Sequence, residues 1–451
     1  MKTLFRKLHG TTPIENAAVS IVKTLKANGF SAFFVGGFVR DSLLDLKVKD
    51  IDIATDATPD EITGMFKRTI PTGAAFGVIT VVIDHTPFEV ATFRAEADYS
   101  DGRRPDKIEY ANAEADAVRR DFTINALFYD PVEACIIDFS TGLSDLDHGI
   151  LQTVGEPGLR FSEDYLRMLR AVRFTSRLGF KPDTQLIEAI KSNASKIADI
   201  AQERIYVELT SMLTGKNPHC AFDLLLETGL LDQILPEVVM LKGCDQPKQF
   251  HPEGDVWNHT MLALSKLDEN PSPELAWATL LHDIGKPDTL SYKVDGTPTT
   301  PAHAAVGAGL AEKILRRLKA SRRTIEIVTN AVHQHMTFIN IQQMRPAKLR
   351  RFLSDEHFPL HLELHRVDCQ SASGMMENYH FAKEKLEVLE SGDGSALPPP
   401  LITGKDLIDM GFKPDFRFKK ILTKVQDMQL AGTMNSKAEA LNWAKENFNG
   451  A

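Results

Sequence analysis

The chain has 451 residues, enough for about two to four domains with substantial cores. Its 43% apolar and 25% charged residues are ordinary for a globular protein, and no window approaches the roughly 18 uncharged apolar residues of a membrane-spanning helix. We therefore expect no membrane partner. The net charge of −9 argues only mildly against a nucleic-acid partner, because such binding depends on local basic patches.

The N-terminal residues and the cysteines bear on the cellular compartment. Residues 1–10 carry charge but lack the apolar core of a signal peptide, so we expect a cytoplasmic protein. Cys135, Cys220, Cys244 and Cys369 lie far apart and form no CxxC pair. We expect them to be reduced, buried and structural.

The first predicted elements are a helix over 13–28, from apolar residues at helical spacing, and an apolar strand over 31–35. The strand runs into Gly36 and Gly37, which let backbone N–H groups approach a chain of phosphates closely. Arg40 follows and adds a charged donor. This stretch is suited to hold a nucleoside triphosphate.

Two acidic residues come next. Asp50 and Asp52 alternate with Ile51 and Ile53, so the sequence predicts both carboxylates on one face of a strand. Neighbouring carboxylates repel each other unless a cation lies between them, and hard oxygen ligands suit Mg²⁺. With the glycine pair, this pattern indicates phosphoryl or nucleotidyl transfer. A solvated edge strand is the plain alternative.

A helix start is predicted at 58–61, where a capping Thr is followed by Pro and two acids. Strands over 77–84 and 87–94 follow, joined by a short turn at residues 85–86. Glu89 on the second strand is a candidate third carboxylate of the metal site. A glutamate of an edge strand that faces water is an equal alternative.

The string RRDFTINA at 119–126 follows a polar, turn-forming segment over 99–105. Asp121 and Asn125 are four residues apart, so on a helix they share a face and can hold a ribose hydroxyl. Arg120 beside them can meet a phosphate. A structural capping role is the alternative.

A basic, periodic stretch occupies residues 160–174. Asp164, Arg167 and Arg170 recur every three residues, with Arg173 next, and are predicted to share one face of a helix. An Asp acceptor beside an Arg donor matches cytosine and adenine and opposes uracil and guanine. The stretch is a candidate site for reading the base, and a helix-surface ion pair is the alternative.

The second half of the chain carries a different chemistry. His282 and Asp283 are adjacent inside an apolar run, with further His and Asp residues before and after them. This arrangement predicts a metal site, and imidazole with carboxylate favours Mn²⁺, Ni²⁺, Fe²⁺ or Zn²⁺ over Mg²⁺. A Gly- and Pro-rich linker is predicted over 390–400, followed by a basic helical tail that is a candidate RNA contact.

Several of these strings resemble known motifs. The pattern GGxVRD at 36–41 followed by KDID at 49–52 is similar to the signature of class II CCA-adding enzymes and bacterial poly(A) polymerases. The string at 119–126 is similar to the second motif of that family, and the EDxxR pattern at 163–167 resembles its base-reading motif. The match departs from the usual pattern at Asp45, where the family commonly has Gly.

The resemblance implies that Asp164 and Arg167 read the base, and that residues 101–105 form a loop that closes on the nucleotide. It implies tRNA, CTP and ATP as partners, and Mg²⁺ held by Asp50 and Asp52 with Glu89 as a third catalytic carboxylate. The expected nucleotide-binding residues are Gly36, Gly37, Arg40, Arg104, Arg120, Asp121, Asn125, Asp164, Arg167, Arg170 and Arg173.

The later His-Asp region resembles the HD phosphohydrolase superfamily, whose ligands are a His, a His-Asp pair and a later Asp. The resemblance implies His259, His282, Asp283 and Asp368 as ligands. His303 and His335 would be the added ligands of a two-metal version.

The expected fold class is therefore α+β. We expect a polymerase-beta-like nucleotidyltransferase head with a small sheet (1–148), a helical neck that binds tRNA (149–240), an HD domain (241–390) and a linker with a helical tail (391–451). The expected function is Mg²⁺-dependent addition of CCA to tRNA, with a possible HD phosphohydrolase activity. An A-adding or CC-adding partial enzyme, a poly(A) polymerase and a non-catalytic RNA-binding protein stay open as alternatives.

Overall fold

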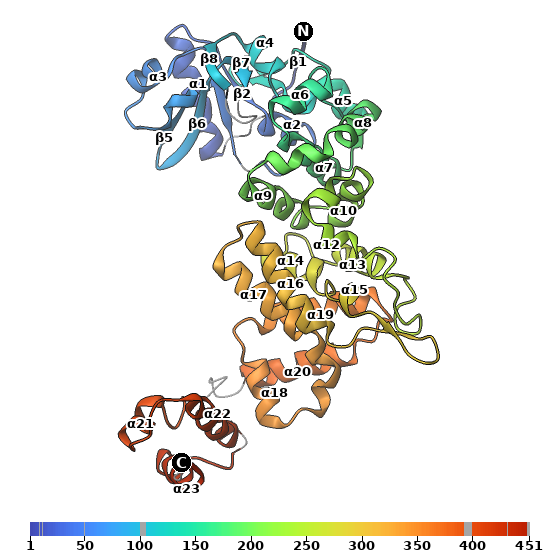
Figure 1. The fold of residues 1–451 in the computed structure, drawn as a ribbon. Coiled ribbons are helices and arrows are strands. Elements are labelled where there is room, and N and C mark those ends of the chain that lie inside the picture. Colours follow the sequence, from blue (N-terminus) through green and yellow to red (C-terminus); the bar gives the residue numbers. More distant parts are fainter. Residues whose placement is uncertain are drawn as a thin grey trace. The chain divides into compact units, whose positions relative to one another are not determined.

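The computed structural model describes residues 1–8, 10, 12–48, 50–99, 105–391, 399–430 and 432–448. The chain divides into two compact units, Met1–Pro236 and Glu237–Ala451. The first unit combines a sheet with helices, and the second is built mainly from helices (Figure 1). No helix in the described part of the chain has both the length and the apolar character needed to cross a membrane.

The centre of the first unit is an 8-stranded sheet with the order β1-β10-β9-β2-β3-β6-β5-β4. Among the described pairs of this sheet, β3 and β6 run parallel and the others run antiparallel. The strands are β1 (Lys2–Phe5), β2 (Ala32–Val35), β3 (Asp52–Thr55), β4 (Thr69–Gly73), β5 (Val78–Ile83), β6 (Thr86–Thr92), β9 (Leu127–Asp130) and β10 (Cys135–Asp138). A mixed sheet followed by helices confirms the predicted α+β class.

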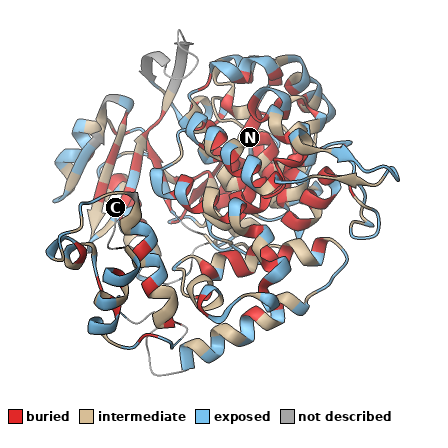
Figure 2. Cartoon of the chain, turned by 60° about the horizontal axis from the view of Figure 1, so that its bottom comes forward, coloured by how far each residue is buried: buried red, intermediate tan, exposed pale blue. Residues whose placement is uncertain are grey.

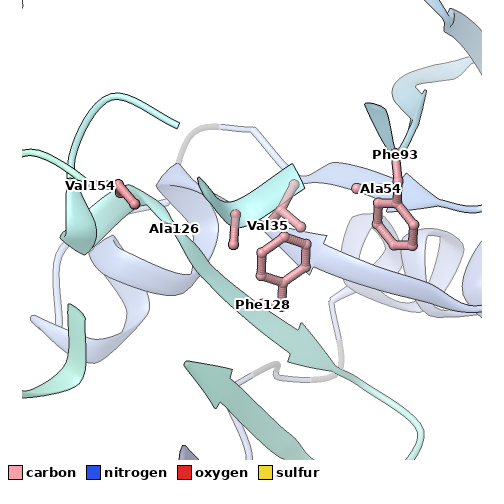
Figure 3. Packing of buried hydrophobic residues seen from close by; sticks show 7 residues of the cluster. Val35, Ala54, Phe93, Ala126, Phe128 and Val154 are labelled. Atoms are coloured by element: carbon pink, nitrogen blue, oxygen red, sulfur yellow. The ribbon is translucent and has the colours of Figure 1, made fainter. Parts of the chain in front are cut away.

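A cluster of buried residues holds the middle of this sheet together (Figure 3). Val35 of β2, Ala54 of β3 and Phe128 of β9 come from neighbouring strands. Phe93 follows β6 and meets Phe128 edge to face, with the ring centroids 6.2 Å apart. The two strands that carry predicted carboxylates, β3 and β6, are therefore fixed by one shared core.

Capping boxes begin two helices of the first unit, and the one at α3 lies where the sequence predicts a helix start. Thr12 and Glu15 form a capping box at the start of α1, and Thr58 and Glu61 form another at the start of α3. The helices are α1 (Pro13–Ala27), α2 (Gly37–Leu43), α3 (Pro59–Met65), α4 (Ala113–Val118), α5 (Gly142–His148), α6 (Pro157–Glu163), α7 (Leu166–Leu178), α8 (Thr184–Asn193), α9 (Gln202–Leu213), α10 (Pro218–Glu227) and α11 (Leu230–Ile234).

The turn between β5 and β6 lies one residue earlier than predicted. Ile83 pairs with Thr86, so the two turn residues are Asp84 and His85 rather than His85 and Thr86. Both have positive φ, at 45° for Asp84 and 66° for His85. A two-residue hairpin turn that matches the strand twist needs this left-handed geometry, and it sets the register of the hairpin.

The single helix predicted over 160–174 is wrong. Helix α6 ends at Glu163, Asp164 is extended with φ −157° and ψ 103°, and α7 begins at Leu166. The Asp164 carboxylate accepts a hydrogen bond from the Leu166 N–H at 3.0 Å. An Asp side chain that bonds to the backbone two residues later competes with helix formation. At Asp164 this bond interrupts the helix.

The second unit consists of helices whose buried residues face inward (Figure 2). A short hairpin of β13 (Ser291–Tyr292) and β14 (Pro298–Thr299) interrupts them. The helices are α13 (Val256–Ser265), α14 (Pro273–Leu281), α15 (Lys286–Thr289), α16 (His303–Arg317), α17 (Arg322–Gln334), α18 (Pro346–Leu353), α19 (Phe358–Ser371), α20 (Glu377–Ser391), α21 (Gly404–Asp409), α22 (Phe416–Leu430) and α23 (Lys437–Phe448). The last three share a small apolar core of their own.

All four cysteines are free thiols. Cys135 and Cys244 are buried and Cys369 is half-buried. The prediction of burial is wrong for Cys220, which is exposed on α10 because Ala221, Phe222 and Leu225 form the buried face of that helix.

A tight backbone contact at Gly285 supports the second unit. A Cβ atom at Gly285 would lie 2.2 Å from the His303 carbonyl oxygen and 2.5 Å from the Gly307 nitrogen. We expect Gly285→Ala to destabilise this unit by roughly 2 kcal/mol or more, because backbone atoms cannot move aside. Gly309→Ala on α16 is the control, since a Cβ there meets nothing within 4 Å. Urea unfolding measures both, and a Gly285→Ala protein as stable as the wild type would contradict the prediction.

A buried histidine predicts acid sensitivity in the same unit. His361 of α19 is 2% exposed and neither ring nitrogen has a hydrogen-bond partner in the described structure. Burial lowers the pKa of the His361 imidazole, so the folded state holds it neutral. Its stability contribution is complete above the unfolded-state pKa of about 6.5 and is lost as pH falls through that value.

We expect His361→Leu to remove this loss. Below pH 6.5 the stability of the variant relative to the wild type should grow by at most about 1.4 kcal/mol for each pH unit. His380→Leu, at an exposed position of α20, is the control. Unfolding curves between pH 5 and pH 8 provide the measurement, and parallel curves for the wild type and His361→Leu would exclude the effect.

Two candidate active sites

The first site begins where β2 passes into α2. Gly36 has φ +63°, and a Cβ atom there would lie 3.2 Å from Arg120 Nη1. Glycine therefore serves two purposes at this position, since it permits the left-handed turn and lets an arginine approach the backbone. Gly37 is the first residue of α2, and Arg40 lies one turn further along.

The predicted carboxylates lie on neighbouring strands of the sheet. Asp52 is the first residue of β3, and Glu89 lies on the parallel strand β6, one residue before the pair of Ile53 and Val90. Asp50 precedes the strand, so the prediction that both aspartates belong to it is wrong. The alternation holds all the same, because Asp50 and Asp52 are exposed and the isoleucines beside them are buried.

The electrostatics of Asp52 show that these acids influence one another. Partial desolvation raises the pKa of Asp52, repulsion from Glu89 and Asp50 raises it further, and Arg120 opposes the rise. Hard carboxylate oxygens in this setting fit Mg²⁺. They converge less tightly than the ligand groups of the second unit, since in the described residues only that unit holds groups with all ligand atoms within 4.8 Å.

A cavity of about 490 Å³ opens beside Asp52. Most residues predicted to bind the nucleotide line it: Gly36, Gly37, Arg40, Arg120, Asp121, Asn125, Asp164, Arg167, Arg170 and Arg173. Arg119, Arg177 and Arg204 line it as well and were not predicted as site residues. Asp50 and Glu89 lie outside the lining, and Arg104 falls outside the described residues. So many guanidinium groups in one cavity suit a polyanion such as a triphosphate.

Asp121 and Asn125 meet, but not on an α-helix as predicted. Asp121 precedes a short 3₁₀ turn, η2 (Thr123–Asn125), and Asn125 ends it; Asn125 Nδ2 donates to Asp121 Oδ1 at 2.9 Å. Arg170 Nε donates to Asp121 Oδ2 at 2.8 Å, and Arg40 Nη1 donates to Asn125 Oδ1 at 2.6 Å. Burial alone would raise the pKa of Asp121, but Arg170 and Asn125 outweigh it and lower the pKa to about 2.

Asp164 and Arg167 both line the cavity but are held by different partners. Arg204 of α9 donates to Asp164 Oδ2 at 2.6 Å. Arg167 donates to the Glu163 carboxylate and to the Arg119 carbonyl oxygen, the latter at 3.2 Å. No contact between Asp164 and Arg167 side chains is described, so the two halves of the predicted base-reading edge are positioned separately.

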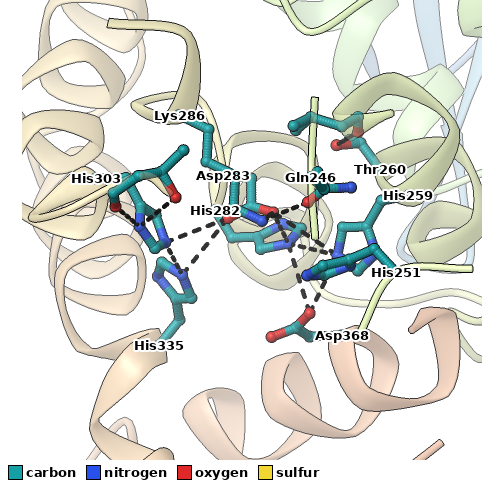
Figure 4. A network of polar contacts seen from close by, with 12 residues as sticks. Gln246, His251, His259, Thr260, His282, Asp283, Lys286, His303, His335 and Asp368 are labelled. Atoms are coloured by element: carbon teal, nitrogen blue, oxygen red, sulfur yellow. Dashed lines mark hydrogen bonds and ion pairs between the residues drawn. The ribbon is translucent and has the colours of Figure 1, made fainter. Parts of the chain in front are cut away.

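The second site forms where helix ends of the second unit converge (Figure 4). His259 lies on α13, His282 and Asp283 follow α14, and His303 begins α16. His335 begins the 3₁₀ segment η4 (His335–Gln343), and Asp368 lies on α19. Every residue predicted for the HD site is thus brought to one place.

Asp283 joins two groups of ligand atoms. Its Oδ2 lies 3.3 Å from His282 Nε2, and that nitrogen lies 3.2 Å from His259 Nε2. Asp368 Oδ1 completes this group at 3.1 Å from His259 Nε2. On the other side, Asp283 Oδ1 lies 3.5 Å from His303 Nε2, with His335 Nε2 3.2 Å from His303 Nε2.

Contacts at Nδ1, the ring nitrogen that points away from the site, set the orientation of the four imidazoles. Nδ1 of His282, His303 and His335 contacts a backbone carbonyl oxygen at 2.8, 2.8 and 2.7 Å. Nδ1 of His259 contacts Glu253 Oε1 at 2.8 Å. These oxygens only accept, so each neutral ring carries its proton on Nδ1 and turns the Nε2 lone pair inward. Two Nε2 atoms that face each other at 3.2 Å need a proton or a metal ion between them, and the donor set fits divalent transition ions.

The pKa values agree with a buried cation site. Burial alone would lower the pKa of His259, but Asp368 and Glu253 outweigh it and raise the pKa to about 9. Without a metal His259 therefore also carries a proton on Nε2, which a bound ion would replace. Burial lowers the pKa of His335 to about 4. The Asp283 carboxyl is held well below its usual pKa range, because Lys286 and His282 outweigh the effect of burial.

Sequence reasoning missed the groups that support this site. Lys286 Nζ lies 2.6 Å from Asp283 Oδ2 and 2.6 Å from Gln246 Oε1. Lys286 follows the His-Asp pair closely and could have been found from that spacing. Gln246 and Glu253 come from irregular chain before α13, where no periodic pattern marks them. A cavity of about 1420 Å³ gives access to Asp283, His303, His335 and Asp368.

Three family models match the chain. The poly A polymerase head domain matches residues 32–152, and the probable RNA and SrmB-binding site of polymerase A matches residues 179–241. The HD domain matches residues 256–367. Head domain and HD domain imply dependence on divalent metals, in agreement with the donor groups at both sites.

Curated relatives are CCA-adding enzymes. The enzyme of Ligilactobacillus salivarius is 47% identical over 214 residues, which are 47% of this chain and 53% of that protein. The enzyme of Lactobacillus helveticus is 41% identical over 261 residues, which are 56% of this chain and 65% of that protein. The chain thus spans about half to two thirds of the length of the relatives it matches.

Solved structures match over almost the whole chain. The Bacillus stearothermophilus CCA-adding enzyme in complex with CTP has a TM-score of 0.72 and 27% identity, covering 97% of this chain and 98% of that one. The Thermotoga maritima CCA-adding enzyme complexed with tRNA is similar in fold, with a TM-score of 0.57, 18% identity and coverage of 97% and 95%. The predicted resemblance is confirmed: the chain carries a poly A polymerase head domain, a polymerase A RNA-binding region and an HD domain, and its curated relatives and structural neighbours are CCA-adding enzymes.

Proposed function

We propose that this chain adds CCA, or part of it, to the 3′ end of tRNA by template-independent transfer from CTP and ATP. The observation that carries the proposal is the arginine-lined cavity of the first unit, which opens beside Asp52. It combines groups for a triphosphate with an acceptor and a donor for a base. The names of the relatives and of the CTP complex support the same substrates.

Each part of the cavity has a distinct role in this proposal. Arg120 and the turn at Gly36 and Gly37 bind the triphosphate, and Arg40 anchors Asn125 from behind. Asp50 and Asp52, with Glu89 on the next strand, would hold Mg²⁺, which when bound aligns the α-phosphate and favours attack by a 3′ hydroxyl. The base meets Asp164 and Arg167, which accept from and donate to cytosine or adenine.

The proposed division of labour follows the predicted domains: head 1–148, neck 149–240, HD domain 241–390, and linker with tail 391–451. The neck and the tail would bind tRNA, and a cytoplasmic location stays a prediction. One experiment separates full CCA addition from its alternatives, which are partial A addition or CC addition, poly(A) synthesis and RNA binding without catalysis. tRNAs that lack one, two or all three CCA nucleotides are incubated with each triphosphate, and the products are read on a sequencing gel.

Removal of one head carboxylate tests the metal role. We expect Asp52→Asn to lower nucleotide addition by roughly a hundredfold or more, because the site loses charge that holds its cation. Binding of tRNA should change little. Asp60→Asn, at an exposed position of α3, is the control. An Asp52→Asn enzyme within tenfold of wild-type activity would rule out this assignment.

For the second unit we propose a transition-metal phosphoesterase site. Four inward Nε2 atoms and two carboxylates carry the proposal, because this donor set suits Mn²⁺, Ni²⁺, Fe²⁺ or Zn²⁺. A bound ion would supply an activated water for attack on a phosphoester. Terminal or cyclic phosphates at the 3′ end of tRNA are suitable substrates, since they block extension. Lys286, beside Asp283, would help to bind the phosphate.

Metal stoichiometry tests the two ligand groups apart from any activity. We expect the wild type to bind two Ni²⁺ or Mn²⁺ ions per chain and His303→Ala to bind one, because the group around His259, His282 and Asp368 stays complete. The control is His333→Ala, an exposed histidine of α17 that lies in neither group. Elemental analysis after dialysis gives the counts. An unchanged count in His303→Ala, or no bound metal in the wild type, would defeat the two-ion proposal.

A further inference from the structure

The proposed base-reading acceptor is held by an arginine from another helix. Arg204 of α9 donates to Asp164 from Nη2 to Oδ2 at 2.6 Å and from Nη1 to Oδ1 at 3.3 Å. Both residues line the cavity, with 20% of the Asp164 side chain and 23% of the Arg204 side chain exposed. We propose that Arg204 is a positioning residue that sets base selectivity through Asp164. The inference rests on the proposed nucleotidyl transfer at this cavity.

The contacts of the Asp164 carboxylate leave one direction open. A carboxylate has about four lone-pair sites. The Leu166 N–H occupies one site on Oδ1, at 3.0 Å, and Arg204 Nη1 occupies the second. Arg204 Nη2 occupies one site on Oδ2. The remaining lone pair of Oδ2 is left for the exocyclic amine of cytosine or adenine, where uracil and guanine present a carbonyl.

The donor half of the edge does not depend on Arg204. Arg167 is held by the Glu163 carboxylate and by the Arg119 carbonyl oxygen. The described side-chain hydrogen bonds of Arg204 go to Asp164. A change at Arg204 therefore acts on the acceptor and leaves the donor in place.

An arginine is suited to this task because its planar fork fixes the plane of a carboxylate with two parallel bonds. Without Arg204, Asp164 keeps only the contact with the Leu166 N–H, and its carboxylate is free to rotate. A site rejects a wrong base strongly only while its polar partners are held in place, since a loose partner can turn away from the mismatched group. The loss of Arg204 should therefore affect which base is added more than how tightly a triphosphate binds.

The test compares Arg204→Leu and Arg204→Lys with the wild type. For each protein, kcat/KM is measured with CTP, UTP, ATP and GTP on tRNAs truncated at the matching position. We expect the CTP-to-UTP and ATP-to-GTP ratios of Arg204→Leu to fall roughly tenfold to a hundredfold, the effect of one lost hydrogen bond to a charged group. Arg204→Lys should retain more selectivity, because it keeps the charge but not the fork.

A double-mutant cycle shows whether Arg204 acts through Asp164. In an Asp164→Ala background, Arg204→Leu should change the two ratios by less than about twofold, because the group that it positions is gone. If Arg204 contacts the triphosphate instead, its loss raises KM for all four nucleotides equally and leaves the ratios unchanged. That result would overturn the inference.

Controls separate this inference from a folding defect and from the function on which it rests. Val207→Ser changes a 59% exposed residue of the same helix and should leave both ratios unchanged. Unaltered circular dichroism and tRNA binding of Arg204→Leu exclude unfolding. A wild type that adds no nucleotide to any truncated tRNA contradicts the proposed function. A wild type that selects C and A, beside an Arg204→Leu variant that selects them equally well, contradicts the role of Arg204 alone.

Discussion

The cavity of the first unit depends on carboxylates that form ion pairs with the arginines lining it. Every arginine that lines the head cavity forms an ion pair with a carboxylate: Asp41, Asp116, Asp121, Asp164, Glu163 or Glu208. Guanidinium groups gathered in one partly buried cavity repel each other, and an unpaired buried charge is strongly destabilising. The carboxylates offset that repulsion and fix each fork, so the cavity is ready for an anion before one binds.

The second unit also gathers like groups in a small space, but these groups are imidazole nitrogens rather than positive charges. Its imidazoles turn their Nε2 atoms toward two groups joined by Asp283, and the repulsion within each group is offset by a proton or a metal cation. Each ring is anchored by its Nδ1 to a carbonyl oxygen or to Glu253, which fixes both the tautomer and the orientation. In both units the groups that we propose as ligand contacts are held in place by a second layer of hydrogen bonds or ion pairs.

Local signals and short motifs carried the successful predictions. The helix start at α3, the glycine turn and the His-Asp pair each depend on residues close in sequence, so their chemistry can be read directly. The failures have two causes. Nothing near Asp164 in the sequence indicates that Arg204, forty positions away, holds its carboxylate. The break between α6 and α7 and the support from Glu253 arise from close neighbours in the sequence, but a turn-forming Asp inside a helical pattern and an irregular segment carry no periodic signal.

Several ion pairs of the cavity cross the predicted boundary between head and neck at residue 148. Asp41, on the helix that follows the glycine turn, is bonded by Arg177 of α7, and Asp121 is bonded by Arg170 of the same helix. Helix α9 supplies the partner of Asp164 and the Glu208 that pairs with Arg173. Strands of the sheet thus carry Asp52 and Glu89, which we propose as metal ligands, while α7 and α9 carry and orient charged residues that line the cavity. A boundary at residue 148 separates two folding patterns but divides one site, so helices expected to bind tRNA also shape the cavity that would select the base.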